Sequence, residues 1–114
     1  YIRPHRHAAD RGEGLVVLSG KLLYLAFDDT GEVGQALLLQ PGSETFGVDI
    51  DGGVWHCFIA LEPDTALFEV KPGPYDAATD KEFAPWAPEE CSAAAAGYLE
   101  ALVRRFRKNP TTSR

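Results

Sequence analysis

The chain has 114 residues, of which 45% are apolar and 25% are charged, a composition typical of one globular domain. Its net charge is −6, and lysine and arginine do not gather on any expected strand, so we expect no nucleic-acid partner. No apolar run approaches the ~20 residues of a membrane span, and no secretory signal is visible. We therefore expect a cytoplasmic protein without a membrane partner, in which Cys57 and Cys91 are reduced thiols.

Residues 14–71 alternate between short apolar segments and clusters of turn-forming residues. Glycine, proline and aspartate recur about every 8–12 residues, a spacing typical of an all-β sandwich or barrel. The expected strands are 14–19, 21–28, 33–39, 44–50, 55–62 and 65–71.

Two of these segments, 22–27 and 37–39, are apolar on both faces of their strands. Such a pattern predicts that the outer face is covered too, by a helix or by a second subunit. On this basis we expect a homodimer.

Residues 71–88 hold four of the eight prolines together with three aromatic residues. A flexible linker would lack the aromatics, so we expect an ordered loop that packs back on the barrel. Tyr75, Asp80 and Trp86 are candidates for a lid or a dimer contact, and core packing is the preferred interpretation for Trp86.

The last predicted element is a helix from about residue 88 to residue 108, where apolar residues recur at helical spacing. Pro88 suits the first helical position, and Glu89 and Glu90 suit its positive end. The expected organisation is therefore a barrel over 1–88, a helix over 89–108 packed on the barrel, and a disordered tail over 109–114.

The sequence contains three histidines, and two of them lie close together near its start. His5 and His7 are two residues apart, so on a strand both imidazoles point to the same face. His56 follows the glycine turn at 52–53, and the strands between can return it to the first pair. Imidazoles gathered in this way with a carboxylate are a common ligand set for one divalent transition metal, Fe, Mn, Ni, Co or Zn.

Two carboxylates compete for the fourth ligand position. Glu13 lies at the start of an expected strand, and Asp10 lies in the loop between it and His7. We favour Glu13 and keep Asp10 as the alternative. Cys57 directly follows His56, and neighbours on a strand point to opposite faces, so Cys57 is a poor ligand candidate.

These residues resemble the two motifs of the cupin superfamily. The spacing of His5, His7 and Glu13 is similar to the first motif, and residues 51–56, which read Asp-Gly-Gly-Val-Trp-His, are similar to the second. Residues 68–75 and 80–88 are similar to the WbuC-type family of cupin-fold metalloproteins, and this likeness extends to about residue 90. The resemblance implies a double-stranded β-helix (jelly-roll) barrel in which the metal ligands are His5, His7, Glu13 and His56.

Three positions depart from the cupin pattern. The loop 8–12 is longer than usual, which keeps Asp10 open as a ligand. Asp51 stands where the second motif usually has proline, and Ala60 stands where asparagine is usual. Neither of these two changes touches a ligand.

Four further residues are candidates for contacting a small-molecule substrate. Arg3 shares strand parity with the first two histidines, and Phe58 shares it with the third. Glu69 and Tyr75 lie in the segment that resembles the WbuC-type family. Each also has a plain structural interpretation: a solvated terminal side chain for Arg3, barrel core for Phe58, a surface ion pair with Lys71 for Glu69, and a lid or dimer contact for Tyr75.

The function expected from this pattern is a metal-dependent enzyme that acts on a small polar substrate such as a sugar or nucleotide-sugar, of the isomerase, epimerase, hydrolase or dioxygenase type. The WbuC-type resemblance implies a link to bacterial surface-polysaccharide (O-antigen) biosynthesis. The alternative is a non-catalytic binding or sensory domain whose metal anchors the ligand or the fold. A third, weaker option is a metal-free epimerase with a histidine base. No catalytic residue is assigned.

Overall fold

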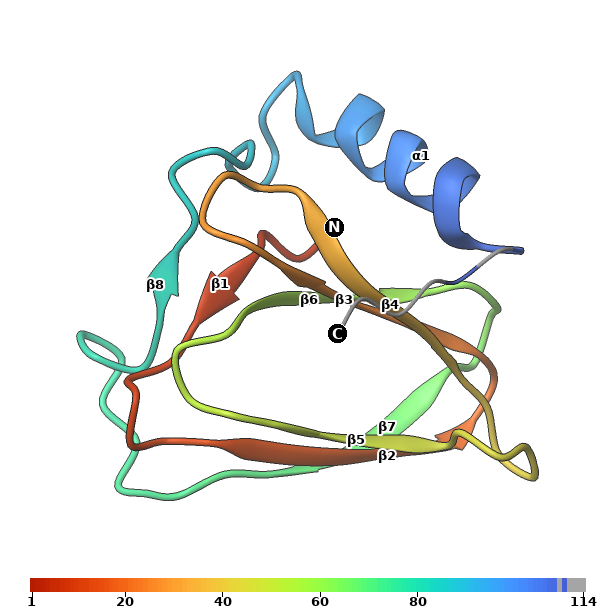
Figure 1. Cartoon of the computed structure of the whole chain (residues 1–114), viewed down its shortest axis with the longest axis horizontal. Helices are drawn as coiled ribbons and strands as arrows, with labels where there is room; N and C mark the ends of the chain where they lie inside the picture. The colour runs from red at the N-terminus through yellow and green to blue at the C-terminus, as the bar shows by residue number, and fades with distance from the viewer. Residues whose placement is uncertain (109, 111–114) are drawn as a thin grey trace.

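The computed structural model, which describes residues 1–108 and 110, is built from strands and one C-terminal helix (Figure 1). The elements are β1 (His5–Arg6), β2 (Glu13–Ser19), β3 (Leu22–Phe27), β4 (Val33–Leu39), β5 (Gly47–Ile50), β6 (Trp55–Ala60), β7 (Ala66–Val70), β8 (Glu82–Phe83) and α1 (Ala95–Phe106). Each of the six expected strands overlaps an observed one. An all-β fold with a C-terminal helix is therefore confirmed.

The strands form two antiparallel sheets that face each other. One has the order β4-β3-β6-β1-β8 and the other the order β5-β2-β7. Figure 1 shows the two sheets as separate layers, with α1 lying outside the larger one. The side chains between the layers form an apolar interior of Leu15, Val17, Leu22, Tyr24, Leu39, Ile50 and Phe58.

A second core lies between the larger sheet and α1. It joins Leu23 and Leu25 of β3 with Leu102 and Phe106 of the helix. The helix thus covers the outer face of residues 22–27. The two-sided apolar pattern predicts that either a helix or a second subunit covers this face. The pattern is satisfied within one chain, and the homodimer stays a prediction.

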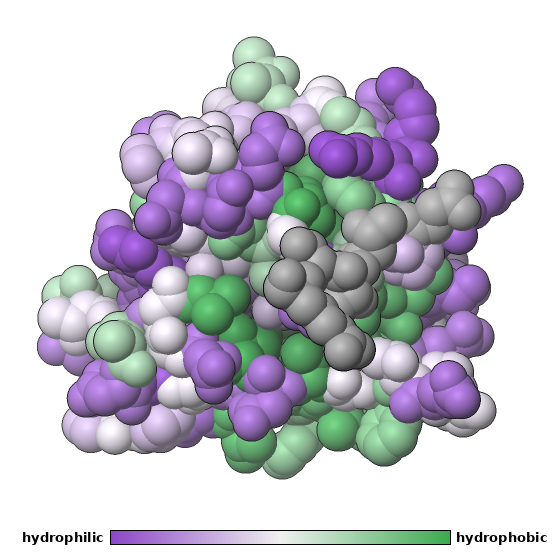
Figure 2. Space-filling view, in the orientation of Figure 1, coloured by the Kyte–Doolittle hydropathy of each residue, from purple (hydrophilic) through white to green (hydrophobic). Residues whose placement is uncertain are grey.

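Hydrophobic side chains remain exposed on the outer face of the smaller sheet. Figure 2 shows them along the lower edge of the view, where β2 and β5 lie. The exposed residues are Val16, Leu18, Phe46, Phe68 and Val70. Most of them line a groove of about 490 Å³. Within the described residues, α1 covers the outer face of the larger sheet, and the outer face of the smaller sheet stays exposed.

The helix begins at Ala95, seven residues later than expected. Residues before it form turns instead, and Cys91 adopts a left-handed backbone conformation with φ 62°. The N-terminal segment holds this stretch: the Tyr1 hydroxyl donates to the Pro88 carbonyl (2.8 Å), and the Arg3 backbone N–H donates to Glu90. Pro88 therefore does not start the helix, and no acidic residue lies in its first turn.

The second half of the 71–88 segment packs on the larger sheet as expected. Its β8 strand, which sequence patterns did not indicate, pairs with β1. The Trp86 ring lies 5.0 Å from that of Phe27 and 6.1 Å from that of Trp55, which confirms its core interpretation. Residues 71–79, in contrast, are exposed.

No helix in the described ranges, 1–108 and 110, is long and apolar enough to cross a membrane. The predicted tail at 109–114 lies outside the described residues except for Pro110.

Truncation of Leu102 should destabilise the fold, because its side chain fills the core between α1 and the larger sheet. We expect Leu102→Ala to lower the free energy of unfolding by about 2–5 kcal/mol in chemical denaturation. Glu100→Ala, at an exposed position of the same helix, is the control and should change it by less than about 0.5 kcal/mol. Equal effects of the two changes would contradict the packing of α1 on the sheet.

The two free cysteines should react at different rates. Cys57 is buried beneath α1, and burial raises its pKa to about 12, whereas Cys91 is exposed. Because the thiolate is the reactive form, a chromogenic disulfide reagent at mildly alkaline pH should modify Cys91 rapidly and Cys57 only after unfolding. Cys91→Ser should remove the rapid phase. A rapid phase that survives this change would show that Cys57 is accessible.

Candidate metal centre

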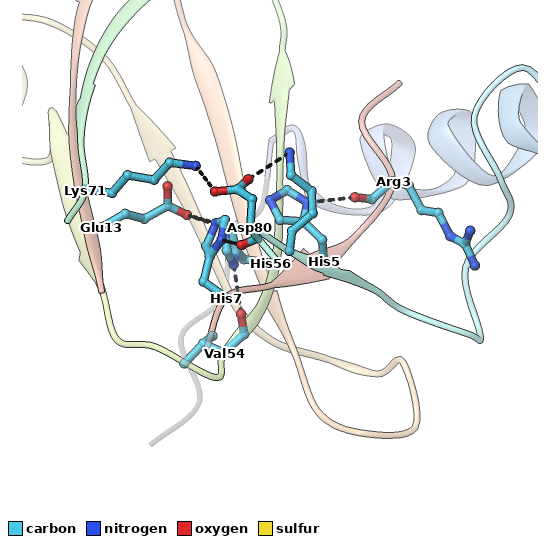
Figure 3. A network of polar contacts seen from close by, with 9 residues as sticks. Arg3, His5, His7, Glu13, Val54, His56, Lys71 and Asp80 are labelled. Carbon is cyan, nitrogen blue, oxygen red and sulfur yellow. Dashed lines mark hydrogen bonds and ion pairs between the residues drawn. The ribbon is translucent and has the colours of Figure 1, made fainter. Parts of the chain in front are cut away.

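The pairing of β1 with β6 brings the histidines together. His5 on β1 lies directly opposite His56 on β6, and His7 follows β1 by one residue. Glu13 begins β2 in the facing sheet. The four side chains therefore meet between the two sheets, and all four residues are buried (Figure 3).

The four side chains are close enough to share one ion. One potential ligand atom from each lies within 4.8 Å of the others. Oε1 of Glu13 is 3.1 Å from Nε2 of His7 and 2.6 Å from Nε2 of His56. The His5 ring centroid lies 4.6 Å from that of His56.

Each imidazole is oriented by a backbone carbonyl. Nδ1 of His5 lies 2.9 Å from the Arg3 oxygen, Nδ1 of His7 lies 2.6 Å from the Asp80 oxygen, and Nδ1 of His56 lies 2.8 Å from the Val54 oxygen. A carbonyl oxygen can only accept, so each Nδ1 must donate its hydrogen. In the neutral ring this leaves a lone pair on each Nε2. This is the arrangement in which an outer hydrogen bond fixes a metal-binding histidine.

A cation among the converging atoms would satisfy them. Oε1 of Glu13 and Nε2 of His56 are both buried and lack a hydrogen-bond partner despite their short separation. Lone pairs that face each other in a buried place are unfavourable, because buried polar groups require a partner. A divalent ion would satisfy all four atoms at once.

The protonation states also suit metal ligands. Burial lowers the pKa of His5 to about 4, so this ring is neutral at pH 7. Burial alone would raise the pKa of Glu13, but its contacts with His56, Glu69 and His7 lower it to about 2. Neutral imidazole and ionised carboxylate are the forms that bind a metal. The residues present therefore fit a divalent transition ion.

The structure selects Glu13 over Asp10 as the carboxylate of the group. Asp10 is exposed in the loop 8–12 and is not part of the buried group. This loop packs against the glycine turn at 52–53. The Gly53 N–H donates to the His7 carbonyl (2.9 Å), and a Cβ at Gly52 would collide with the carbonyls of the loop.

The candidate substrate residues are placed differently from one another. Phe58 is buried in the interior with its ring 5.5 Å from that of His56, so it forms a wall of the site. The Arg3 guanidinium points away from the imidazoles and donates to the Ala84 carbonyl at 2.9 Å (Figure 3). Arg3 serves the centre through its backbone oxygen instead. Tyr75 is 71% exposed on the 71–79 segment.

Glu69 lies against the centre. It faces the interior from β7, opposite Leu15, and its carboxyl group contacts that of Glu13. Burial and the contact with Glu13 raise the pKa of Glu69 to about 7. The expected surface ion pair with Lys71 is replaced by a bond from Lys71 Nζ to Asp80 Oδ1 (2.9 Å).

Asp80 has a role that sequence reasoning did not assign. Its backbone oxygen orients His7, and its carboxylate holds Lys71. A contact made by a backbone carbonyl leaves no trace in residue type, so the sequence carries no signal for it.

Protein purified without a histidine tag should contain about one divalent metal ion per chain by elemental analysis. Glu13→Gln should weaken metal binding by at least about tenfold, since even residues beyond the ligands change affinity by 10–100-fold. Asp10→Asn is the matched control and should leave affinity unchanged. The metal should raise the free energy of unfolding by about 2.7 kcal/mol when the free ion is at about 100 times its Kd. If Asp10→Asn weakened metal binding and Glu13→Gln did not, Asp10 would be the ligand.

Comparison with known proteins gives a family match at the N-terminal end of the chain. Residues 1–39 match a family described as a domain of unknown function, DUF6016. This segment contains His5, His7 and Glu13 but not His56. Searches of curated proteins and of solved structures gave no significant match.

Proposed function

We propose that this chain is a cupin-type metalloprotein that uses one divalent transition ion, held by His5, His7, Glu13 and His56, to act on a small polar substrate such as a sugar or nucleotide-sugar. The observation that carries the proposal is the convergence of three carbonyl-oriented imidazoles on an ionised, buried carboxylate. The two facing antiparallel sheets are compatible with a cupin barrel.

The bound ion would polarise a carbonyl or hydroxyl oxygen, or activate water. The chain supplies the rest of the site. Tyr24 and Phe58 form an apolar wall beside His56, which excludes water from that side. Glu69 offers a carboxyl group beside Glu13 that can exchange a hydrogen bond with a substrate hydroxyl.

The coordination preference of the ion separates two functions. Four protein ligands complete the tetrahedral shell typical of structural zinc. An ion that prefers six ligands, such as Fe, Mn or Ni, keeps two positions for substrate or water. A catalytic site therefore favours an ion that accepts more than four ligands.

A non-catalytic binding or sensory domain is the second candidate. The observation that favours it is the burial of the ligands, which are 8% exposed or less. Such burial is also what a metal that only holds the fold would show. A histidine base without metal fits less well, because the Nε2 atoms of His7 and His56 face Glu13.

The biological setting follows only from the WbuC-type resemblance. On that basis we propose a role in bacterial surface-polysaccharide biosynthesis. The cytoplasmic location and the homodimer are separate proposals, drawn from the composition and from the two-sided apolar strands. The resemblance lies in residues 68–75 and 80–88 and in the two histidine motifs.

The proposal predicts turnover that depends on the ion. Tag-free protein, loaded separately with each of the five candidate metals, is incubated with a panel of sugars and nucleotide-sugars, and products are detected by NMR. We expect conversion with an ion that binds six ligands, and its loss both in chelator and in Glu13→Gln. Asp10→Asn should retain activity.

Identical behaviour of metal-free and metal-loaded protein on every compound would refute the enzyme. A compound that binds the loaded protein tightly and is recovered unchanged would favour the binding domain.

A further inference from the structure

A pair of lysines stands beside the metal centre. Nζ of Lys71 lies 2.9 Å from Oδ1 of Asp80, and Nζ of Lys81 lies 3.8 Å from Oδ2 of the same carboxylate. The backbone oxygen of Asp80 is the hydrogen-bond acceptor of His7. Figure 3 shows Lys71 and Asp80 next to Glu13 and His7. One residue thus joins the lysine pair to the centre.

We propose that Lys71 and Lys81 form an anion-binding subsite at the mouth of the metal centre. The ligand of this centre would then be a small hydroxylated anion, with one oxygen for the metal and a carboxylate or phosphate group for the lysines. This inference rests on the proposed metal centre and adds the class of its ligand.

The two lysines are much more exposed to solvent than the proposed ligands. The side chains of Lys71 and Lys81 are 31% and 38% exposed, whereas those of the ligands Glu13 and His56 are 3% and 1% exposed. Glu69, which contacts Glu13, is exposed as well. A solvent molecule or ligand that approaches the centre from this side meets the lysines and Glu69 first.

The charge at the mouth favours an anion. Two ammonium groups share the one carboxylate of Asp80, so one positive charge is left over. A divalent ion likewise exceeds the single charge of Glu13. Even when Glu69 is ionised, the positive charges exceed the negative ones. A ligand that carries one negative charge would neutralise this excess at close range, where the interaction is strong.

The lysines have the hydrogen-bonding capacity to hold both partners. An ammonium group has three N–H donors, and the bond from Lys71 to Asp80 Oδ1 occupies one of them. An incoming carboxylate or phosphate can therefore bind without displacing Asp80. The carboxyl group of Glu69, beside Glu13 and near Lys71, suits a hydroxyl group rather than a second anion. This combination selects a hydroxylated acid or a sugar phosphate over an uncharged sugar.

The test compares ligands that differ only in charge. Titration calorimetry on cobalt-loaded, tag-free protein measures the affinity for gluconate and for sorbitol, which share a carbon chain and differ in the carboxylate. Glucose 6-phosphate and glucose form the second pair and separate phosphate from carboxylate recognition. We expect at least one anion to bind about tenfold or more tightly than its neutral counterpart.

The lysines are then tested directly. The double variant Lys71→Met/Lys81→Met should remove the preference for the anion while its metal content stays at the wild-type level. Lys21→Met is the matched control, because Lys21 is similarly exposed (33%) and paired with Glu62. Lys21 directly precedes the first residue of β3, whereas Ala26, which pairs with His56, lies near the other end of this strand. Lys21 is therefore distant from the proposed centre along β3. This control should keep the preference.

The outcomes separate the subsite from the metal centre. Loaded protein that binds neither anion, binds anion and neutral partner equally, or keeps its preference in the double variant overturns the subsite and leaves the metal centre intact. Protein that takes up no metal overturns the proposed function and the subsite with it. Metal content is measured again after each titration, so that removal of the ion by gluconate is not mistaken for binding.

Discussion

Three hydrogen bonds between imidazole Nδ1 atoms and backbone carbonyls determine what this site can do. They fix the tautomer of His5, His7 and His56, and so they direct three Nε2 lone pairs to one point. Two of the three carbonyls belong to residues two positions before the histidine itself, Arg3 and Val54. The third comes from Asp80, far along the chain. Local backbone geometry thus orients two ligands, and tertiary packing orients the third.

The contribution of Asp80 explains why the 71–88 segment is needed near the centre. The strand β1 spans only two residues, His5 and Arg6, and β6 pairs with it through a single register position. A strand this short gains little from its own ladder. β8 completes its other side, and the Ala84 N–H donates to the Pro4 carbonyl (2.9 Å). The segment therefore supports β1 from outside while Asp80 orients His7.

Residue type and turn spacing were enough to predict the six long strands and to single out the four side chains that the fold brings together. Both signals are local: glycine and proline end strands, and imidazole chemistry limits what three histidines can do. The start of α1 was predicted wrongly because Pro88 and Glu89 are compatible with a first helical turn, while contacts from Tyr1 and Arg3 hold that stretch elsewhere. β8 and the role of the Asp80 carbonyl were missed because both depend on backbone hydrogen bonds. Every residue type carries a backbone carbonyl, so residue identity gives no signal for such a contact.

The ligands come from both sheets, and this has a consequence for folding. His5 and His56 belong to the larger sheet, whereas Glu13 starts β2 in the smaller one. A bound ion therefore links the two layers at one end of the apolar interior, where the donor atoms would otherwise repel one another. Burial of Glu13 and His56 without a compensating cation weakens the layer contact at that end. Because the ion would bind the folded arrangement and not the dispersed ligands of an unfolded chain, its binding free energy becomes folding free energy. Binding of an ion at the proposed centre would thus be coupled to closure of the two sheets.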